Sequence, residues 1–265
     1  FAKILADAER PMIIVGSGAV ARDDGAAVLE LARNVAEKTN MISPDWNGFN
    51  VLHRAASRVG GLDIGFLPGD GGRDVAGIVD AAGKGEIDLV WLLGADEIDM
   101  AGLGDAFVVY QGHHGDAGAH RADVILPGAA YTEKDATWVN TEGRVQLGRR
   151  AAYPPGDARE DWTILRAFSA IMEQPLPYDN LQQLRHHMVE VVPSMGLIDE
   201  VGPGEMGAFG VAGDVDGAAF ESPIDDYYLA NAICRASAVM ADCSRLYSGT
   251  GTNSGSTGGA TGTDG

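Results

Sequence analysis

Short apolar runs, each followed at once by a glycine-containing or polar loop, constrain the fold of this chain most strongly. They cover residues 12–15, 89–93, 107–110 and 123–126. The runs do not alternate apolar with polar residues, which favours strands buried on both faces of a sheet. Helical patterns separate them. The sequence therefore predicts an α/β fold with a doubly wound, mostly parallel sheet over about residues 10–150.

Helical spacing and turn residues predict the elements between and after these strands. Apolar residues recur at helical spacing over about residues 24–38, where Asp23 and Asp24 offer an N-cap. A turn at Glu142-Gly143 predicts a hairpin over residues 136–147. Residues 60–72 are rich in glycine and are expected to be irregular. Further helices are predicted over residues 51–59, 74–83, 160–172, 180–191 and 226–246.

These elements divide the chain into three parts. Residues 1–150 are expected to form the α/β domain, and residues 151–247 a helical C-terminal extension that packs on it. Residues 248–265 consist almost entirely of Gly, Ser and Thr. A segment of this composition has no apolar side chains to bury, so we expect a disordered tail.

Charge and cysteine content limit the functions open to the chain. The net charge is −19, which opposes binding to nucleic acid and adsorption to an anionic membrane. No apolar run approaches the roughly 18 to 20 residues that span a bilayer. Cys234 and Cys243 are too few to hold an iron–sulfur cluster, which typically needs four thiolates. Because the chain starts at Phe1 without a methionine or a signal-like segment, we expect it to begin inside a longer protein.

The loop after the first strand has the form of a dinucleotide-binding fingerprint. Residues 16–21 read GSGAVA and satisfy the G-x-G-x-x-G/A pattern. In that motif the helix begins at the second glycine, so that its amides face the pyrophosphate. Here Asp23 and Asp24 place two carboxylates where the phosphates would sit. The pattern favours a tight strand-to-helix turn over an NAD site.

Two other groups of polar residues could form a metal site or a catalytic site. His113, His114, Asp116 and His120 are possible zinc ligands, but their spacing matches no standard zinc site. A second group lies around the hairpin, where a carboxylate pair could act in acid–base catalysis; it consists of Glu133, Asp135, Asn140, Glu142 and Arg144. Because the sequence shows no nucleophile nearby, we favour a hairpin whose polar side chains bond to its backbone over a catalytic pair.

The remaining candidates have ordinary structural interpretations. His186 and His187 lie on a predicted helix and are expected to face solvent. Cys234 and Cys243 lie on the last predicted helix and are expected to be packed thiols. The residues alone therefore indicate no catalytic, cofactor-binding or metal-binding side chain.

The central sequence resembles the large iron–sulfur subunit of respiratory complex I. Residues 110–116 read YQGHHGD, residues 122–134 read ADVILPGAAYTEK, and residues 136–144 read ATWVNTEGR. The last two follow a form shared across molybdopterin oxidoreductases, and the first narrows the resemblance to complex I. Further similar stretches are residues 11–16, 24–27, 52–57, 92–96, 158–162, 176–179 and 235–243. The likeness covers residues 1–195 and 223–247, but not 196–222 or the tail.

The resemblance implies a molybdopterin-oxidoreductase-like fold and a place in the peripheral arm. The cysteines and the histidine that hold the family's iron–sulfur clusters lie N-terminal to the matched region, so no cofactor is expected in this segment. In molybdopterin enzymes, loops equivalent to those after Leu93 and Tyr110 approach the pterin, so a relic crevice is expected here.

The resemblance also implies a function. We expect a scaffold portion of NADH:quinone oxidoreductase that supports electron transfer from NADH to quinone and contacts other peripheral-arm subunits. It would lie on the cytoplasmic side of a bacterial inner membrane or on the mitochondrial matrix side. One alternative is the C-terminal part of a molybdopterin-dependent oxidoreductase such as a formate dehydrogenase. Another is a free-standing NAD-binding enzyme built on residues 16–21.

Overall fold

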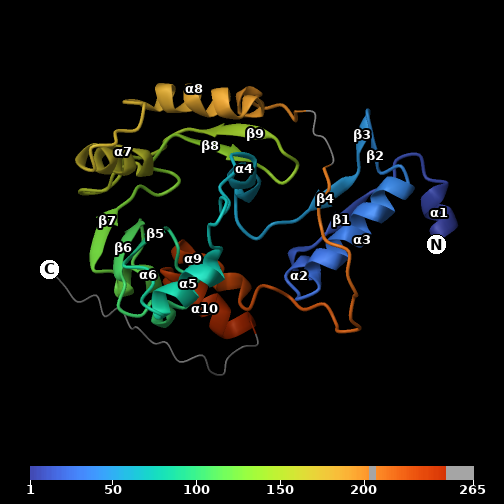
Figure 1. The fold of residues 1–265 in the computed structure, drawn as a ribbon, viewed down its shortest axis with the longest axis horizontal. Helices are drawn as coiled ribbons and strands as arrows, with labels where there is room; N and C mark the ends of the chain where they lie inside the picture. The colour runs from blue at the N-terminus through green and yellow to red at the C-terminus, as the bar shows by residue number, and fades with distance from the viewer. Residues whose placement is uncertain (203–206, 249–265) are drawn as a thin grey trace.

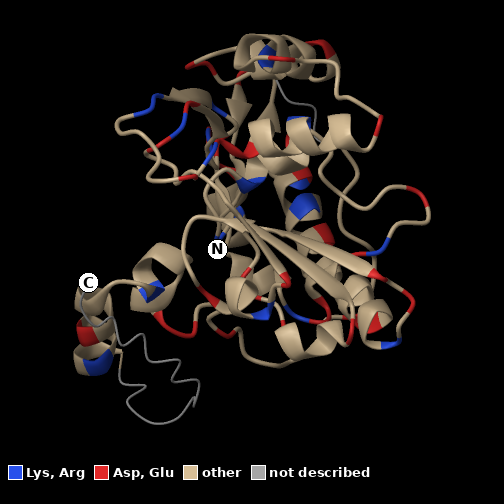
Figure 2. Cartoon of the chain, turned by 90° about the vertical axis from the view of Figure 1, so that its left-hand side faces the viewer, with Lys and Arg blue, Asp and Glu red and all other residues tan. Residues whose placement is uncertain are grey.

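A three-stranded parallel sheet forms the centre of the larger part of the molecule (Figure 1). The computed structural model describes residues 1–202 and 207–248. Strands β5 (Leu89–Leu93), β6 (Phe107–Gly112) and β7 (Val124–Pro127) pair in the order β5-β6-β7. Each lies within a residue or two of its predicted position. These strands contain no charged residue, and the acidic positions lie in the loops and helices around them (Figure 2).

The main hydrophobic core lies on one face of this sheet. Val90, Leu92, Val108 and Tyr110 point to this face and are buried, together with Leu103. The elements that cover them are the helices α5 (Val75–Gly83), η1 (Met100–Leu103) and α6 (Ala117–Arg121). Asp74 caps α5, since its carboxylate accepts a hydrogen bond from Gly77 N at 2.8 Å.

A second parallel pair lies nearer the N-terminus. Strand β1 (Ile13–Val15) pairs with β4 (Phe49–Val51), and the α-helices α2 (Ser17–Val20) and α3 (Gly25–Lys38) follow β1. Between α3 and β4, a small antiparallel hairpin joins β2 (Ile42–Ser43) and β3 (Trp46–Asn47). The α/β class with parallel strands is confirmed. The parallel strands, however, are shared between this pair and the three-stranded sheet.

The predicted helix over residues 51–59 is wrong. Its first residue belongs to β4, and Leu52 N continues the pairing by donating to Val15 O at 2.9 Å. Ser57 has φ +58°, a left-handed conformation that interrupts a right-handed helix. The α-helix α4 (Arg58–Asp63) begins only after it and extends into the stretch that we expected to be irregular. Pairing with β1 thus overrides the local helical pattern.

The hairpin and the first two helices after it lie where predicted. Strands β8 (Ala136–Val139) and β9 (Val145–Gly148) are antiparallel. A second core is formed by Val139, Val145 and Met195. Two further α-helices are α7 (Asp161–Ile171) and α8 (Leu181–Val191), and the short helix η2 (Pro193–Gly196) follows.

The predicted single helix over residues 226–246 is divided into three. The pieces are η3 (Tyr227–Leu229), α9 (Ala232–Arg235) and α10 (Ala238–Tyr247). Asn231 accepts a hydrogen bond from Cys234 N, and Ser237 accepts one from Met240 N. Each of these side chains caps a new helix, so the chain changes direction at both positions.

At the N-terminal end of the chain, a short helix α1 (Ala2–Ala6) precedes β1. The predicted tail over residues 248–265 lies outside the described residues, apart from Ser248. Among the described residues, no helix combines the length and the apolar character needed to cross a membrane. The division into domains at residue 150 stays a prediction.

Candidate functional site

The loop that resembles a dinucleotide fingerprint is covered by the chain's own C-terminal part. A methyl group added at Gly18 would lie 2.4 Å from the carbonyl oxygen of Glu221 and 3.2 Å from Pro223 Cδ. The same addition at Gly16 would meet nothing within 4 Å. The second glycine of the motif thus allows a close approach of the chain's own backbone, at the position where the motif admits a pyrophosphate.

Residues 207–223 form an extended segment that crosses the N-terminal unit, and we call it the strap. It runs beside α3 and β4 (Figure 1). Val211 N donates to Ala26 O at 3.1 Å. Phe209 packs against Phe49 with ring centroids 5.2 Å apart, and its carbonyl accepts from Arg33 Nε at 3.1 Å. These contacts fix the strap along the helix that follows the glycine loop.

Arg22 links the strap to the glycine loop through hydrogen-bonded ion pairs. Its guanidinium donates to Asp24 twice at 2.7 Å and to Asp216 Oδ1 at 2.5 Å, and it lies over the ring of Phe220. The hydrogen bond from Arg22 lowers the pKa of Asp24 to about 2. Asp24 occupies the N-cap position of α3 but makes no side-chain capping bond. The predicted capping role of Asp24 is therefore wrong, because its carboxylate is bound by Arg22 instead.

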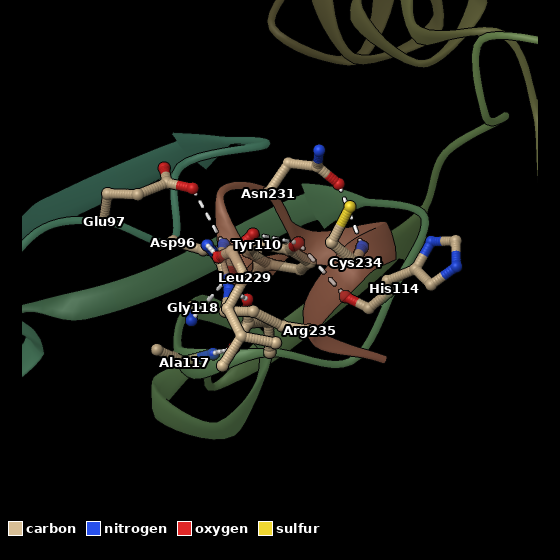
Figure 3. A network of polar contacts seen from close by, with 11 residues as sticks. Asp96, Glu97, Tyr110, His114, Ala117, Gly118, Leu229, Asn231, Cys234 and Arg235 are labelled. Carbon is tan, nitrogen blue, oxygen red and sulfur yellow. Dashed lines mark hydrogen bonds and ion pairs between the residues drawn. The ribbon is translucent and has the colours of Figure 1, made fainter. Parts of the chain in front are cut away.

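A second strand-end region lies above β5 and β6, where ligands bind in open α/β sheets (Figure 3). The Tyr110 hydroxyl donates to Asp96 Oδ2 at 3.0 Å and lies 3.2 Å from the carbonyl oxygen of His114. Asp96 is buried and also accepts from Gly118 N at 2.9 Å. Burial and the hydrogen bond to Asp96 raise the pKa of Tyr110 above its ordinary value. This network fixes the loops after both strands.

Arg235 of α9 closes this second region from above. Its Nε donates to Asp116 Oδ2 at 2.5 Å, its Nη2 donates to Glu97 Oε1 at 2.8 Å, and its Nη1 donates to Leu229 O at 3.2 Å (Figure 3). Glu97 follows β5, and Asp116 is the N-cap residue of α6. One cation of the C-terminal segment therefore forms ion pairs with two carboxylates beside the strand ends.

The histidine-rich loop does not converge on a metal position. His113 Nδ1 and His114 Nδ1 lie 2.6 Å apart, so one ring donates and the other accepts. Desolvation and the neighbouring His114 and Lys134 lower the pKa of His113. Asp116 is committed to Ala117 N and Arg235. Within residues 1–202 and 207–248, no three His, Cys, Asp or Glu side chains are grouped to hold a metal.

A buried glutamine links β6 to α7. Gln111 is fully buried, and its Nε2 donates to Asp161 Oδ1 at 3.0 Å. Lys134 pairs with the other carboxylate oxygen of Asp161. Sequence reasoning missed Asp161, because no local motif marks a residue that pairs 50 positions away. The one available signal was Gln111, a polar residue near the end of an otherwise apolar strand.

The polar group around the hairpin makes backbone contacts, as predicted. Asn140 Oδ1 accepts from Glu142 N and Arg144 N, and Glu142 forms an ion pair with Arg144 at 2.9 Å. Glu133 accepts from Ala130 N, and Asp135 accepts from Arg150 N. The carboxylates are thus engaged in holding the turn, and nothing in their arrangement forms an acid–base pair.

The last sequence candidates are two histidines of α8 and two cysteines of the C-terminal helices. His186 and His187 both contact Glu190 on the exposed side of α8, which agrees with the predicted solvated face. Cys234 and Cys243 are free thiols of intermediate burial. Sequence reasoning also missed Arg22, Asp96 and Arg235. Only tertiary contacts distinguish these three from other charged residues.

Comparison with known protein families identifies two matching regions of the chain. Residues 1–171 match the molybdopterin oxidoreductase family. The chain belongs to the molybdopterin oxidoreductase family. Residues 204–243 match the C-terminal region of the G-type chain of NADH-ubiquinone oxidoreductase. This second match corrects our expectation that residues 196–222 carry no likeness, since it covers residues 204–222 and the whole of the strap.

Within the molybdopterin oxidoreductase family, the chain is similar to large subunits of NADH-ubiquinone oxidoreductase. It is 42% identical over 250 residues to the 75 kDa subunit of Reclinomonas americana, covering 93% of this chain and 36% of that protein. It is 45% identical to the mitochondrial 78 kDa subunits of Candida albicans and Neurospora crassa, covering 90% and 92% of this chain and 33% of each of those proteins. The chain spans about a third of these relatives. The resemblance predicted from the sequence is confirmed.

Proposed function

We propose that the chain is a structural, non-catalytic portion of the large iron–sulfur subunit of an NADH:quinone oxidoreductase. One observation carries this proposal: the chain's own C-terminal part closes both strand-end regions. Glu221 lies on Gly18, and Arg235 binds the acidic groups beside β5 and β6. In this proposal these two closures stand where a pterin or a dinucleotide would bind, and the segment holds no cofactor.

In this proposal the electron carriers lie elsewhere in the parent protein. The iron–sulfur clusters would be bound by its N-terminal region, and this segment would brace that region and neighbouring peripheral-arm subunits. The assembly would lie on the cytoplasmic side of a bacterial inner membrane or on the matrix side of a mitochondrial one. The names of the relatives support a subunit of NADH:quinone oxidoreductase and do not favour a formate dehydrogenase.

Metal content and nucleotide binding test the proposal. The purified parent protein should contain iron and no molybdenum, and it should copurify with other NADH:quinone oxidoreductase subunits. Stoichiometric molybdenum would restore the formate dehydrogenase alternative. NADH titrated into the 265-residue chain should give no binding at micromolar concentration; saturable binding that Gly18→Ala removes would instead favour the free-standing NAD enzyme.

A further inference from the structure

The described fold leaves far more surface exposed than a self-contained protein of this size. The accessible surface is 17808 Å² for a mass of 27.6 kDa. A monomeric globular protein of that mass exposes about 11,000 Å². At about 1.45 Å² per dalton, full exposure of the residues outside the described ranges accounts for about 2,500 Å² of the difference. An excess of about 4,000 Å² remains, several times the roughly 800 Å² that each partner buries in a standard interface.

Part of this excess is an apolar area on the second face of the three-stranded sheet. On the first face, α5, η1 and α6 cover the core. On the second, α7 covers only part of the strands, through contacts with Gln111 and Trp91. Asp161 at the start of α7 binds Gln111, and Phe168 packs edge-on against Trp91 with centroids 4.9 Å apart. Parallel sheets are normally covered on both faces, so this sheet is incomplete by itself.

The uncovered area consists of large apolar side chains that adjoin one another. Leu89 pairs with Phe107 in the β5-β6 register, and they are 50% and 47% exposed. Val124 of β7 pairs with Val109 and lies on the same face. One turn beyond Phe168, Ile171 and Met172 at the end of α7 are also exposed. We call Leu89, Phe107 and Val124 the open face. A contiguous apolar area of this kind marks an interaction site.

We infer that the open face is the docking surface for the polypeptide that forms the other two thirds of the large subunit. This inference rests on the proposed function. The relatives are about three times as long as the matched region, so a partner polypeptide of sufficient size exists in each of them. A second copy of this chain fits poorly, because each copy carries a net charge of −19 and like charges oppose association. The partner contributes an apolar surface with a neutral or basic rim.

A photo-cross-linking experiment in the assembled enzyme tests this. Phe107 is replaced by p-benzoylphenylalanine in the parent protein, in the cell that produces it, and the NADH:quinone oxidoreductase is purified and irradiated. The matched control carries the same replacement at Ile125. Ile125 is 54% exposed in the same sheet but points to the first face, because it pairs with Tyr110. Thermal melts of the two variants of the isolated chain exclude misfolding as the cause of a difference.

The expected result is at least about tenfold more cross-linked product from position 107 than from position 125. The cross-linked peptides should belong to the part of the large subunit that precedes the matched region. Equal yields at both positions, or peptides from a different subunit, would overturn the inference. So would a dimer of the isolated chain, seen by sedimentation, that Phe107→Asp converts to a monomer. If the chain is absent from the purified enzyme, the proposed function itself fails.

Discussion

Arg22 binds Asp24 and Asp216, two carboxylates that lie 192 residues apart in the chain. Asp216 N also donates to Asp24 Oδ2 at 3.0 Å, so the three residues form a closed set of contacts. This set anchors the strap to the start of α3, directly beside the glycine loop. The dinucleotide-like motif is therefore part of an internal interface.

Asp24 should make the stability of the chain depend on pH. Its pKa is lowered from 3.8 to about 2 in the folded protein. A group with a lowered folded pKa contributes stability above its unfolded pKa and loses it as the pH falls through the folded value. Wild type should exceed Asp24→Asn in free energy of unfolding above about pH 5, and the difference should vanish towards pH 2. Urea unfolding at a series of pH values measures it. A difference that stays constant from pH 7 to pH 2 would contradict this role of Asp24.

Gly18→Ala should destabilise the chain, whereas Gly16→Ala should not. The added methyl group at Gly18 would clash with the Glu221 carbonyl, and relieving this overlap costs about 1–3 kcal/mol. Gly16 has open space around it and a φ of −73°, which alanine adopts readily. Urea unfolding compares the two variants. Equal stability of both would show that the strap does not lie on Gly18.

Arg235→Gln should loosen the C-terminal helices from the sheet. The variant loses the ion pair to Asp116, which is partly shielded from solvent, and the pair to the exposed Glu97, and the cost should be about 1–2 kcal/mol. Amide hydrogen exchange should become faster across residues 227–247. Arg245→Gln removes an exposed pair with Asp242 within α10 and should leave that exchange nearly unchanged. Identical exchange in both variants would argue against the closure by Arg235.

Tyr110→Phe should destabilise the strand-end network through Asp96. Removing the hydroxyl leaves a buried carboxylate oxygen without its donor, at a cost of about 1–3 kcal/mol. A double-mutant cycle with Asp96→Asn should give a coupling energy of about 1 kcal/mol between the two side chains. Tyr131→Phe, on an exposed ring, serves as the control and should be nearly neutral. A coupling energy of zero would mean that the contact does not stabilise the fold.

The sequence determined the local elements because their causes are local. The apolar runs at β5, β6 and β7 and the turn at Glu142-Gly143 act within a few residues, so each is visible in the sequence. The motifs around residues 110–144 also identified the family. Where a distant strand competes, as β1 does for residues 49–52, the local pattern gave the wrong element.

Only the tertiary structure decided what the candidate sites are. The contacts of Gly18 with Glu221, of Arg22 with Asp216 and of Arg235 with Asp116 each join residues more than 100 positions apart. No spacing rule predicts such contacts, because they depend on the path of the strap and of the last helices over the strand ends. The sequence by itself thus determined the family and the three strands of the main parallel sheet. Packing decided that the strand ends are closed from within and that one face of the sheet is left open.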